Sequence, residues 1–196
     1  MQIKNLDQLT VVILTYNRQA YALRGMKYWV QQDVAVHVLD GTKDAISKES
    51  LEGVCSDKVF YHHLPISWCQ RIAYAMSLVK TPYVVMCCDD EFYIRSGLLS
   101  CLNELERDPE LVACGGQMVG FDYFFKNIYF WQEGYACDAS AIKQDTPFQR
   151  MSGYSQIYLL ISIYFVVRTE TWKKAFKACT EKEFPAFCIV EVYPIK

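Results

Sequence analysis

Three adjacent carboxylates, Asp89, Asp90 and Glu91, follow an apolar run with the composition of a buried strand, residues 83–88. Negative charges held this close repel one another, and a cation that draws them together relieves that repulsion. Hard oxygen ligands of this kind suit Mg²⁺ or Mn²⁺, so this acid cluster predicts a metal site. The alternative interpretation is a polar turn after a strand, because Asp is a common turn residue.

Polar turns also follow the first two apolar runs of the chain. Residues 11–14 lead into Thr15-Tyr16-Asn17-Arg18, and residues 34–39 lead into Asp40-Gly41-Thr42. Ligands of an open α/β sheet collect outside the carboxyl ends of its strands. We therefore expect these two turns and the acid cluster to form one binding site.

The side chains near these turns have the chemistry to bind a nucleotide. Tyr16 offers a ring that can stack on a base, and Asp40 is an acceptor for a base imino group or a ribose hydroxyl. Arg18 or Arg71 can face a phosphate through charge-assisted hydrogen bonds. A metal ion on the acid cluster would bridge a diphosphate.

The elements that position these residues alternate along the chain between short apolar runs and segments of helical period. This alternation predicts an α/β domain with a largely parallel sheet flanked by helices. From Gly120 to about Tyr154 the periodicity is lost, and we expect a long irregular segment, which is typical of a functional loop or lid. Strands are expected at residues 11–14, 34–39, 58–64, 83–86, 111–114 and 157–167, and helices at 22–30, 67–79, 96–108 and 171–178.

Bulk composition limits the class of protein. A chain of 196 residues is long enough for one sizeable domain, and its hydrophobic fraction of 52% indicates a folded core and not disorder. A net charge of −2 does not indicate the excess of basic residues that is typical of nucleic-acid-binding proteins. No apolar run is long enough to span a membrane and no polybasic segment is present. Peripheral contact with a membrane is left open.

The other metal-ligating residue types do not predict a further site. The chain has nine cysteines but no C-x-x-C pair, which argues against a zinc finger. The odd number of cysteines, their apolar settings and the polar N-terminus predict a reduced, cytoplasmic protein. His62 and His63 are adjacent in an expected strand, so they point to opposite faces and cannot both enter one site without a bulge.

The order of these parts resembles the nucleotide-diphospho-sugar glycosyltransferases of the GT-A fold, especially family-2-like enzymes. The resemblance spans roughly residues 9–192, and it is most specific in the first two-thirds. The segments that carry it are Thr15 to Arg18, Leu39 to Thr42, Arg71 within residues 69–73, residues 81–86 leading into the DxD-type motif Asp89-Asp90-Glu91-Phe92, and the strand-helix unit that begins with Tyr164 to Arg168.

The resemblance implies transfer of a sugar from a nucleoside diphosphate sugar to a saccharide or other hydroxyl acceptor, with Mn²⁺ or Mg²⁺ as cofactor and inversion at the anomeric carbon. The general base that inversion requires would be Glu191, with Glu183 as the alternative. The chain would form a single domain, 1–196, with a nucleotide-sugar-binding half at 9–110 and an acceptor-side half at 111–196. The donor would contact Thr15, Tyr16, Arg18, Asp40, Arg71, Asp89, Gly115 and Gly116, and the metal would bind Asp89, Asp90 and Glu91.

The sequence departs from the family pattern at three places. Leu39 stands where many members have a first Asp, which leaves base recognition to Asp40, and Glu91 stands where a third Asp is common. The chain ends five residues after Glu191, where family enzymes continue with a helix, so we expect a truncated form or a natural short variant. If that helix is missing, a catalytically inactive nucleotide-sugar-binding module is the alternative. Sugar-phosphate nucleotidyltransferases carry a Gly-rich loop with an Arg immediately after the first strand. Residues 15–18 occupy that place and contain no glycine, so this activity is disfavoured.

Overall fold

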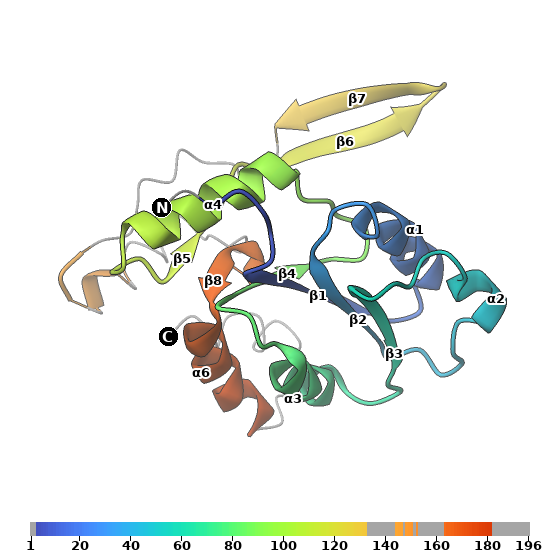
Figure 1. The fold of residues 1–196 in the computed structure, drawn as a ribbon, viewed down its shortest axis with the longest axis horizontal. Coiled ribbons are helices and arrows are strands. Elements are labelled where there is room, and N and C mark those ends of the chain that lie inside the picture. The colour runs from blue at the N-terminus through green and yellow to red at the C-terminus, as the bar shows by residue number, and fades with distance from the viewer. Residues whose placement is uncertain (1–2, 133–143, 147, 151, 153–162, 182–196) are drawn as a thin grey trace.

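The computed structural model describes residues 3–132, 144–146, 148–150, 152 and 163–181 of the chain. Within these ranges it is an α/β fold built around one six-stranded sheet, with a separate two-stranded hairpin (Figure 1). The strands are β1 (Leu9–Thr15), β2 (Ala35–Asp40), β3 (Val59–His63), β4 (Tyr83–Cys87), β5 (Ala113–Cys114), β6 (Val119–Phe124), β7 (Asn127–Gln132) and β8 (Val166–Arg168). The helices are α1 (Gln19–Trp29), α2 (Lys48–Leu51), α3 (Trp68–Leu78), α4 (Arg95–Arg107) and α6 (Thr169–Thr180).

The central sheet has the strand order β3-β2-β1-β4-β8-β5. The first four of these strands are parallel, so their carboxyl ends lie along one edge. The late strand β8 pairs antiparallel with both β4 and β5. The largely parallel sheet predicted from the sequence is therefore confirmed, with one antiparallel strand inserted near its end.

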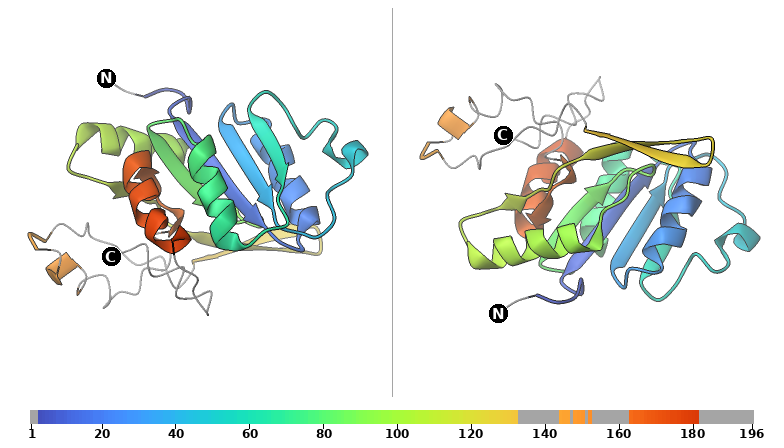
Figure 2. Two further views of the ribbon diagram at one scale, coloured as in Figure 1. Left: turned by 90° about the horizontal axis from the view of Figure 1, so that it is seen from below. Right: turned by 90° about the horizontal axis from the view of Figure 1, so that it is seen from above.

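Helices cover both faces of the sheet (Figure 2). One face packs against α1 and α4 through a buried cluster that includes Trp29, Leu98 and Leu102. The other face packs against α3 and α6 through a second cluster that includes Trp172 and Phe176. With both faces covered, β1 and β4 are buried along almost their whole length, which explains their near-continuous apolar sequences.

Helix α3 begins where the sequence predicts. The Ser67 side chain accepts a hydrogen bond from the backbone of Gln70, and the Gln70 side chain accepts one from the backbone of Ser67. This capping box satisfies two backbone donors at the helix start. Within the described ranges, none of the helices has both the length and the apolar character that a membrane crossing requires.

The prediction of an irregular segment from Gly120 onward is wrong for its first part. Strands β6 and β7 form a regular antiparallel hairpin that projects from the domain (Figure 1). Its two-residue turn, Phe125-Lys126, has positive φ values of 48° and 64°. Turns of this kind usually carry Gly or Asn, and the sequence here gives no such signal. Residues 133–143 and 153–162 lie outside the described residues.

Candidate functional site

The carboxyl ends of β1, β2 and β4 meet as the sequence predicts. Thr15 at the end of β1 is the register partner of Asp40 at the end of β2, and the backbone N–H of Gly41 donates to the carbonyl of Thr15 at 2.9 Å. On the other side, the Thr15 hydroxyl donates to Oδ2 of Asp89 at 2.7 Å. Thr15 thus joins the second turn to the acid cluster through buried contacts, so all three segments form one site.

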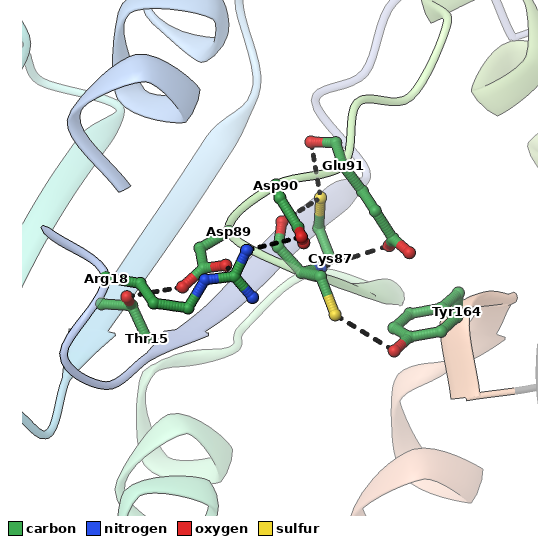
Figure 3. A network of polar contacts seen from close by, with 8 residues as sticks. Thr15, Arg18, Cys87, Asp89, Asp90, Glu91 and Tyr164 are labelled. Atoms are coloured by element: carbon green, nitrogen blue, oxygen red, sulfur yellow. Dashed lines mark hydrogen bonds and ion pairs between the residues drawn. The ribbon is translucent and has the colours of Figure 1, made fainter. Parts of the chain in front are cut away.

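Arg18 provides the cation of the acid cluster (Figure 3). Its Nη2 atom lies 2.5 Å from Oδ2 of Asp90, and its Nη1 atom lies 3.3 Å from Oδ1 of Asp89. The guanidinium also lies over the ring of Tyr21, 4.6 Å from the centroid. Hydrogen bonding to Asp90 is the main reason that the pKa of Arg18 is raised.

The two aspartates of this pair differ in exposure. Asp89 is buried, with 5% of its side chain accessible, whereas Asp90 is 41% accessible. Burial raises the pKa of Asp89, and the Thr15 hydrogen bond and the charge of Arg18 oppose that effect. Asp89 is therefore fixed within the protein, while Asp90 faces solvent and any ligand that approaches the sheet edge.

Glu91 does not join the other two carboxylates. Its Oε2 atom accepts a hydrogen bond of 3.4 Å from the backbone N–H of Cys88, and in Figure 3 its carboxylate lies away from Arg18. Burial raises the pKa of Glu91, the hydrogen bond from Cys88 opposes that effect, and the charges of Asp90 and Asp89 add to it. Among the residues that the structure describes, no three acidic, histidine or cysteine side chains come together as a metal-ligand group. Of the three carboxylates, the structure brings Asp89 and Asp90 together on Arg18 and places Glu91 apart from them, and metal binding itself stays a prediction.

The remaining pair, Asp89 and Asp90, still suits a divalent cation. Both side chains converge on a single positively charged group, Arg18, so their oxygens already share one electrostatic site. Mg²⁺ usually takes only one or two protein carboxylates, with water and substrate phosphates completing its shell. The side chains present therefore fit a metal of this class.

Asp40 is placed differently from the prediction. Its side chain is fully buried and accepts hydrogen bonds from Gln19 and Tyr61 at 2.7 Å and from the backbone of Thr42 at 2.8 Å. Burial alone would raise the pKa of Asp40, but these hydrogen bonds outweigh it and hold the pKa below the ordinary value. A carboxylate with no exposed surface cannot contact a base directly, so its position indicates support of the turn at Thr42.

Arg71 is also buried and faces the backbone, not solvent. Its Nη1 atom donates to the carbonyl of Thr15 at 2.6 Å and to the carbonyl of Leu39 at 3.1 Å, and 5% of the residue is accessible. A Cβ atom on Gly41 would lie 2.6 Å from Cζ of Arg71. Gly41 is therefore needed to admit the guanidinium, and Arg71 holds β1 and β2 together instead of facing a phosphate.

The Tyr16 ring, in the turn after β1, is exposed to solvent. Tyr16 is 59% accessible, which suits the predicted stacking role. Asn17 follows with a positive φ of 56°, a conformation that Asn tolerates better than most residues. Its backbone N–H donates to the hydroxyl of Thr42 at 2.9 Å, which ties this turn to the one after β2.

The two glycines after β5 have unequal surroundings. A Cβ atom on Gly115 would lie 2.2 Å from the Phe165 ring, so this position must be glycine for packing against the segment before β8. A Cβ atom on Gly116 would meet no neighbouring side chain or backbone within 4 Å. The predicted approach of a sugar is therefore compatible with Gly116, whereas packing already explains Gly115.

Two tyrosines outside the predicted site, Tyr93 and Tyr164, hold the segment around the acid cluster in place. The Tyr93 hydroxyl lies 2.8 Å from the carbonyl of Met86 and 2.6 Å from the carbonyl of Tyr164. The Tyr164 hydroxyl in turn lies 3.1 Å from Sγ of Cys88. These contacts connect the end of β4 to the segment before β8. No spacing rule in the sequence identifies them, because they depend on how distant segments pack.

The two predicted bases, Glu183 and Glu191, lie outside the described residues. Their role stays a prediction. The described part of the site thus contains an exposed tyrosine ring, an arginine and two carboxylates on one sheet edge.

Comparison with known proteins agrees with this arrangement. Residues 10–173 match the family model described as glycosyl transferase family 2. Among solved structures, the crystal structure of S. aureus TarS superposes with a TM-score of 0.52 at 14% sequence identity, covering 85% of this chain and 29% of that chain. This chain therefore spans less than a third of the length of TarS, and the likeness shows a common fold. No curated protein matches. Because the family model covers most of the sequence, the chain belongs to glycosyl transferase family 2.

Proposed function

We propose that the chain binds a nucleoside diphosphate sugar at the carboxyl edge of β1, β2 and β4 and transfers its sugar to an acceptor hydroxyl. The observation that carries the proposal is the meeting of Thr15, Arg18, Asp89 and Asp90 at that edge. These residues supply a cation and two carboxylates at the place where open α/β sheets bind ligands. The exposed ring of Tyr16 lies in the turn next to them and would stack on the base.

Each charged residue has a distinct part in this proposal. Asp89 and Asp90 would hold Mn²⁺ or Mg²⁺, and the bound ion would offset the charge that develops on the leaving diphosphate. A cation on the two carboxylates competes with Arg18, so we expect its guanidinium to leave Asp90. Arg18 is 44% accessible and can then donate to a phosphate oxygen.

Buried residues keep these groups in place. Asp40 and Arg71 bind backbone atoms of the turns, and neither is exposed enough to touch the donor. We propose that both are positioning residues. Their hydrogen bonds fix where Tyr16 and Asp89 stand before a ligand arrives, which reduces the entropy that donor binding must remove.

The proposed transfer inverts the anomeric carbon. An acceptor hydroxyl, from a saccharide or another alcohol, attacks that carbon while a general base removes its proton. Glu191 is the predicted base and Glu183 the alternative.

Binding and turnover test the proposal separately. The full chain is mixed with UDP- and GDP-sugars in the presence and absence of Mn²⁺, and its melting temperature and the release of nucleoside diphosphate are measured. We expect metal-dependent stabilisation by at least one donor, together with hydrolysis or transfer. Binding without either reaction indicates an inactive nucleotide-sugar-binding module. Absence of binding to every donor contradicts the proposed site, and pyrophosphate release from a nucleoside triphosphate plus a sugar phosphate indicates a nucleotidyltransferase.

A further inference from the structure

Two histidines from adjacent strands lie side by side on one face of the sheet. Nδ1 of His37 in β2 is 3.1 Å from Nε2 of His62 in β3, and the ring centroids are 5.3 Å apart. The register pairs His62 with Leu39, two residues after His37, so both side chains point to the same face. That face is the one covered by α3, since Leu39 packs in the same cluster as Ile72 of that helix.

The pair is half-buried and held by aromatic neighbours. The Phe60 ring stacks on His37 with a centroid distance of 5.1 Å, and the Tyr74 ring from α3 meets His62 edge-on at 5.6 Å. Phe60 and Tyr74 are 37% and 40% accessible, so solvent reaches this corner of the molecule. The two imidazoles are therefore restrained in position while an ion and its water ligands can still approach.

The separation of the two nitrogens suits a shared metal ion. With metal–nitrogen bonds of 2.0–2.1 Å, two ligands of a tetrahedral ion lie about 3.3 Å apart, close to the observed 3.1 Å. Imidazole nitrogen favours Zn²⁺, Ni²⁺ and Cu²⁺, whereas carboxylate oxygen favours Mg²⁺ and Mn²⁺. We propose that His37 and His62 form a two-histidine site for a transition-metal ion of the zinc, nickel or copper class, with water completing the coordination.

A metal ion can replace the hydrogen bond between the two rings only if both rings are neutral. Burial, aided by the neighbouring His62, lowers the pKa of His37 to about 4, and burial also lowers the pKa of His62. Both rings are then neutral at pH 7, and one nitrogen of the contact carries the proton that the other accepts. On metal binding that proton moves to the opposite nitrogen of its own ring, which frees both facing lone pairs without net proton release.

The ion would fasten the edge of the sheet. Strand β3 is the terminal strand, joined to the sheet through β2 alone. A ligand that binds only the folded pair stabilises the fold by mass action. The site does not depend on the donor-binding proposal, because it uses neither Asp89 nor Asp90 and differs from them in metal preference.

The experiment titrates the full chain, free of any histidine tag, with ZnCl₂ or NiCl₂ in excess Mg²⁺. Isothermal titration calorimetry measures affinity, and NMR spectra of the histidine rings identify the ligands. The chain has three histidines, and we expect the signals of His37 and His62 to shift while those of His63 stay in place. The variants His37→Gln and His62→Gln should each weaken metal binding at least roughly 10-fold. Mutation of a residue that only hydrogen-bonds to a metal ligand already lowers metal affinity by about 10- to 100-fold.

The matched control is His63→Gln. The His63 ring contacts the carbonyl of Thr42 at 2.9 Å and not the pair, so this variant should keep full affinity. Circular dichroism establishes that each variant is folded, and either of the two pair variants is sufficient if the other does not fold. Binding that persists in both, or that shifts no histidine signal, places the ion elsewhere on the chain and overturns the proposal.

Discussion

Nη2 of Arg18 lies 2.5 Å from Oδ2 of Asp90, so the chain itself places a positive charge on its acid cluster. The same guanidinium reaches Asp89, the buried neighbour. The electrostatic repulsion expected from adjacent carboxylates is thus relieved inside the protein. A metal ion that enters this site has to displace an arginine.

Replacing Asp90 with Asn removes one of the two convergent carboxylates. We expect Mn²⁺-dependent binding of a nucleoside diphosphate to be lost while folding is retained, because 41% of the Asp90 side chain is accessible to solvent. The measurement is the shift in melting temperature on adding UDP or GDP with Mn²⁺. Asp57→Asn, an exposed aspartate away from the site, is the control. Unchanged metal-dependent binding in Asp90→Asn would exclude Asp90 as a ligand.

Replacing Arg18 with Gln removes the competing cation. Mn²⁺ alone should then bind more tightly than in the parent chain, while binding of the diphosphate should weaken because a phosphate partner is gone. The ion pair with Asp90 is solvent-accessible, and such pairs contribute about 0–1 kcal/mol. Asp89 keeps its hydrogen bond from Thr15, so the free energy of unfolding should change little. Calorimetric titration with Mn²⁺, and then with nucleotide, separates the two effects. If Arg18→Gln leaves both affinities unchanged, the guanidinium has neither role.

Replacing Thr15 with Val keeps the shape of the side chain but removes the hydroxyl that donates to Asp89. The buried Asp89 carboxylate then keeps Arg18 but loses the hydrogen bond to its Oδ2 atom, which should lower the free energy of unfolding by about 1–3 kcal/mol. Urea denaturation measures the change. Thr15→Ser retains the hydroxyl and should recover most of the loss. Equal stability of the Val and Ser variants would show that the hydrogen bond contributes nothing.

Replacing Gly41 with Ala places a Cβ atom 2.6 Å from Cζ of Arg71. The guanidinium must move from the carbonyls that it binds, and we expect a loss of about 1–3 kcal/mol in the free energy of unfolding. Gly97→Ala is the matched control. Gly97 lies in α4 with open space around it, so that variant should be stabilised by roughly 0.5–1 kcal/mol. Similar effects at the two positions would contradict the proposed packing of Arg71.

Asp40 makes stability depend on pH. Because its folded pKa lies below the ordinary value, its stabilising contribution is complete above the unfolded carboxyl pKa of about 3.9 and is lost as the pH falls through the lower folded value. Asp40→Asn removes this contribution. We expect the difference in urea midpoint between the two chains to be largest near pH 7 and to narrow below about pH 4. A difference that stays constant with pH would contradict this assignment.

Strand-end chemistry was predictable because it follows from local pattern. Apolar runs that end in polar turns identified β1, β2 and β4, and the parallel topology then brought Thr15, Asp40 and Asp89 to one edge. The direction of each side chain was not predictable in the same way. Whether Asp40 faces solvent or Gln19 depends on distances between segments that the sequence does not encode locally.

The hairpin illustrates a second limit. Period-two alternation identifies a strand when one of its faces is polar, but β6 and β7 carry aromatic residues on both faces. Residues such as Phe121, Tyr123, Phe130 and Trp131 are exposed, and the turn lacks glycine. The two cues for a β-hairpin, alternation and turn composition, were therefore both missing from the sequence.

The insertion of β8 between β4 and β5 has a consequence for synthesis of the chain. Arg168 pairs with Tyr83, which precedes it by 85 residues. At about 5–20 residues per second, a ribosome needs roughly 4–17 s to add those residues. Throughout that interval β4 has an unpaired edge, which is open to contact with other nascent chains. Completion of the central sheet is thus delayed until translation has reached β8, long after the acid cluster has left the ribosome.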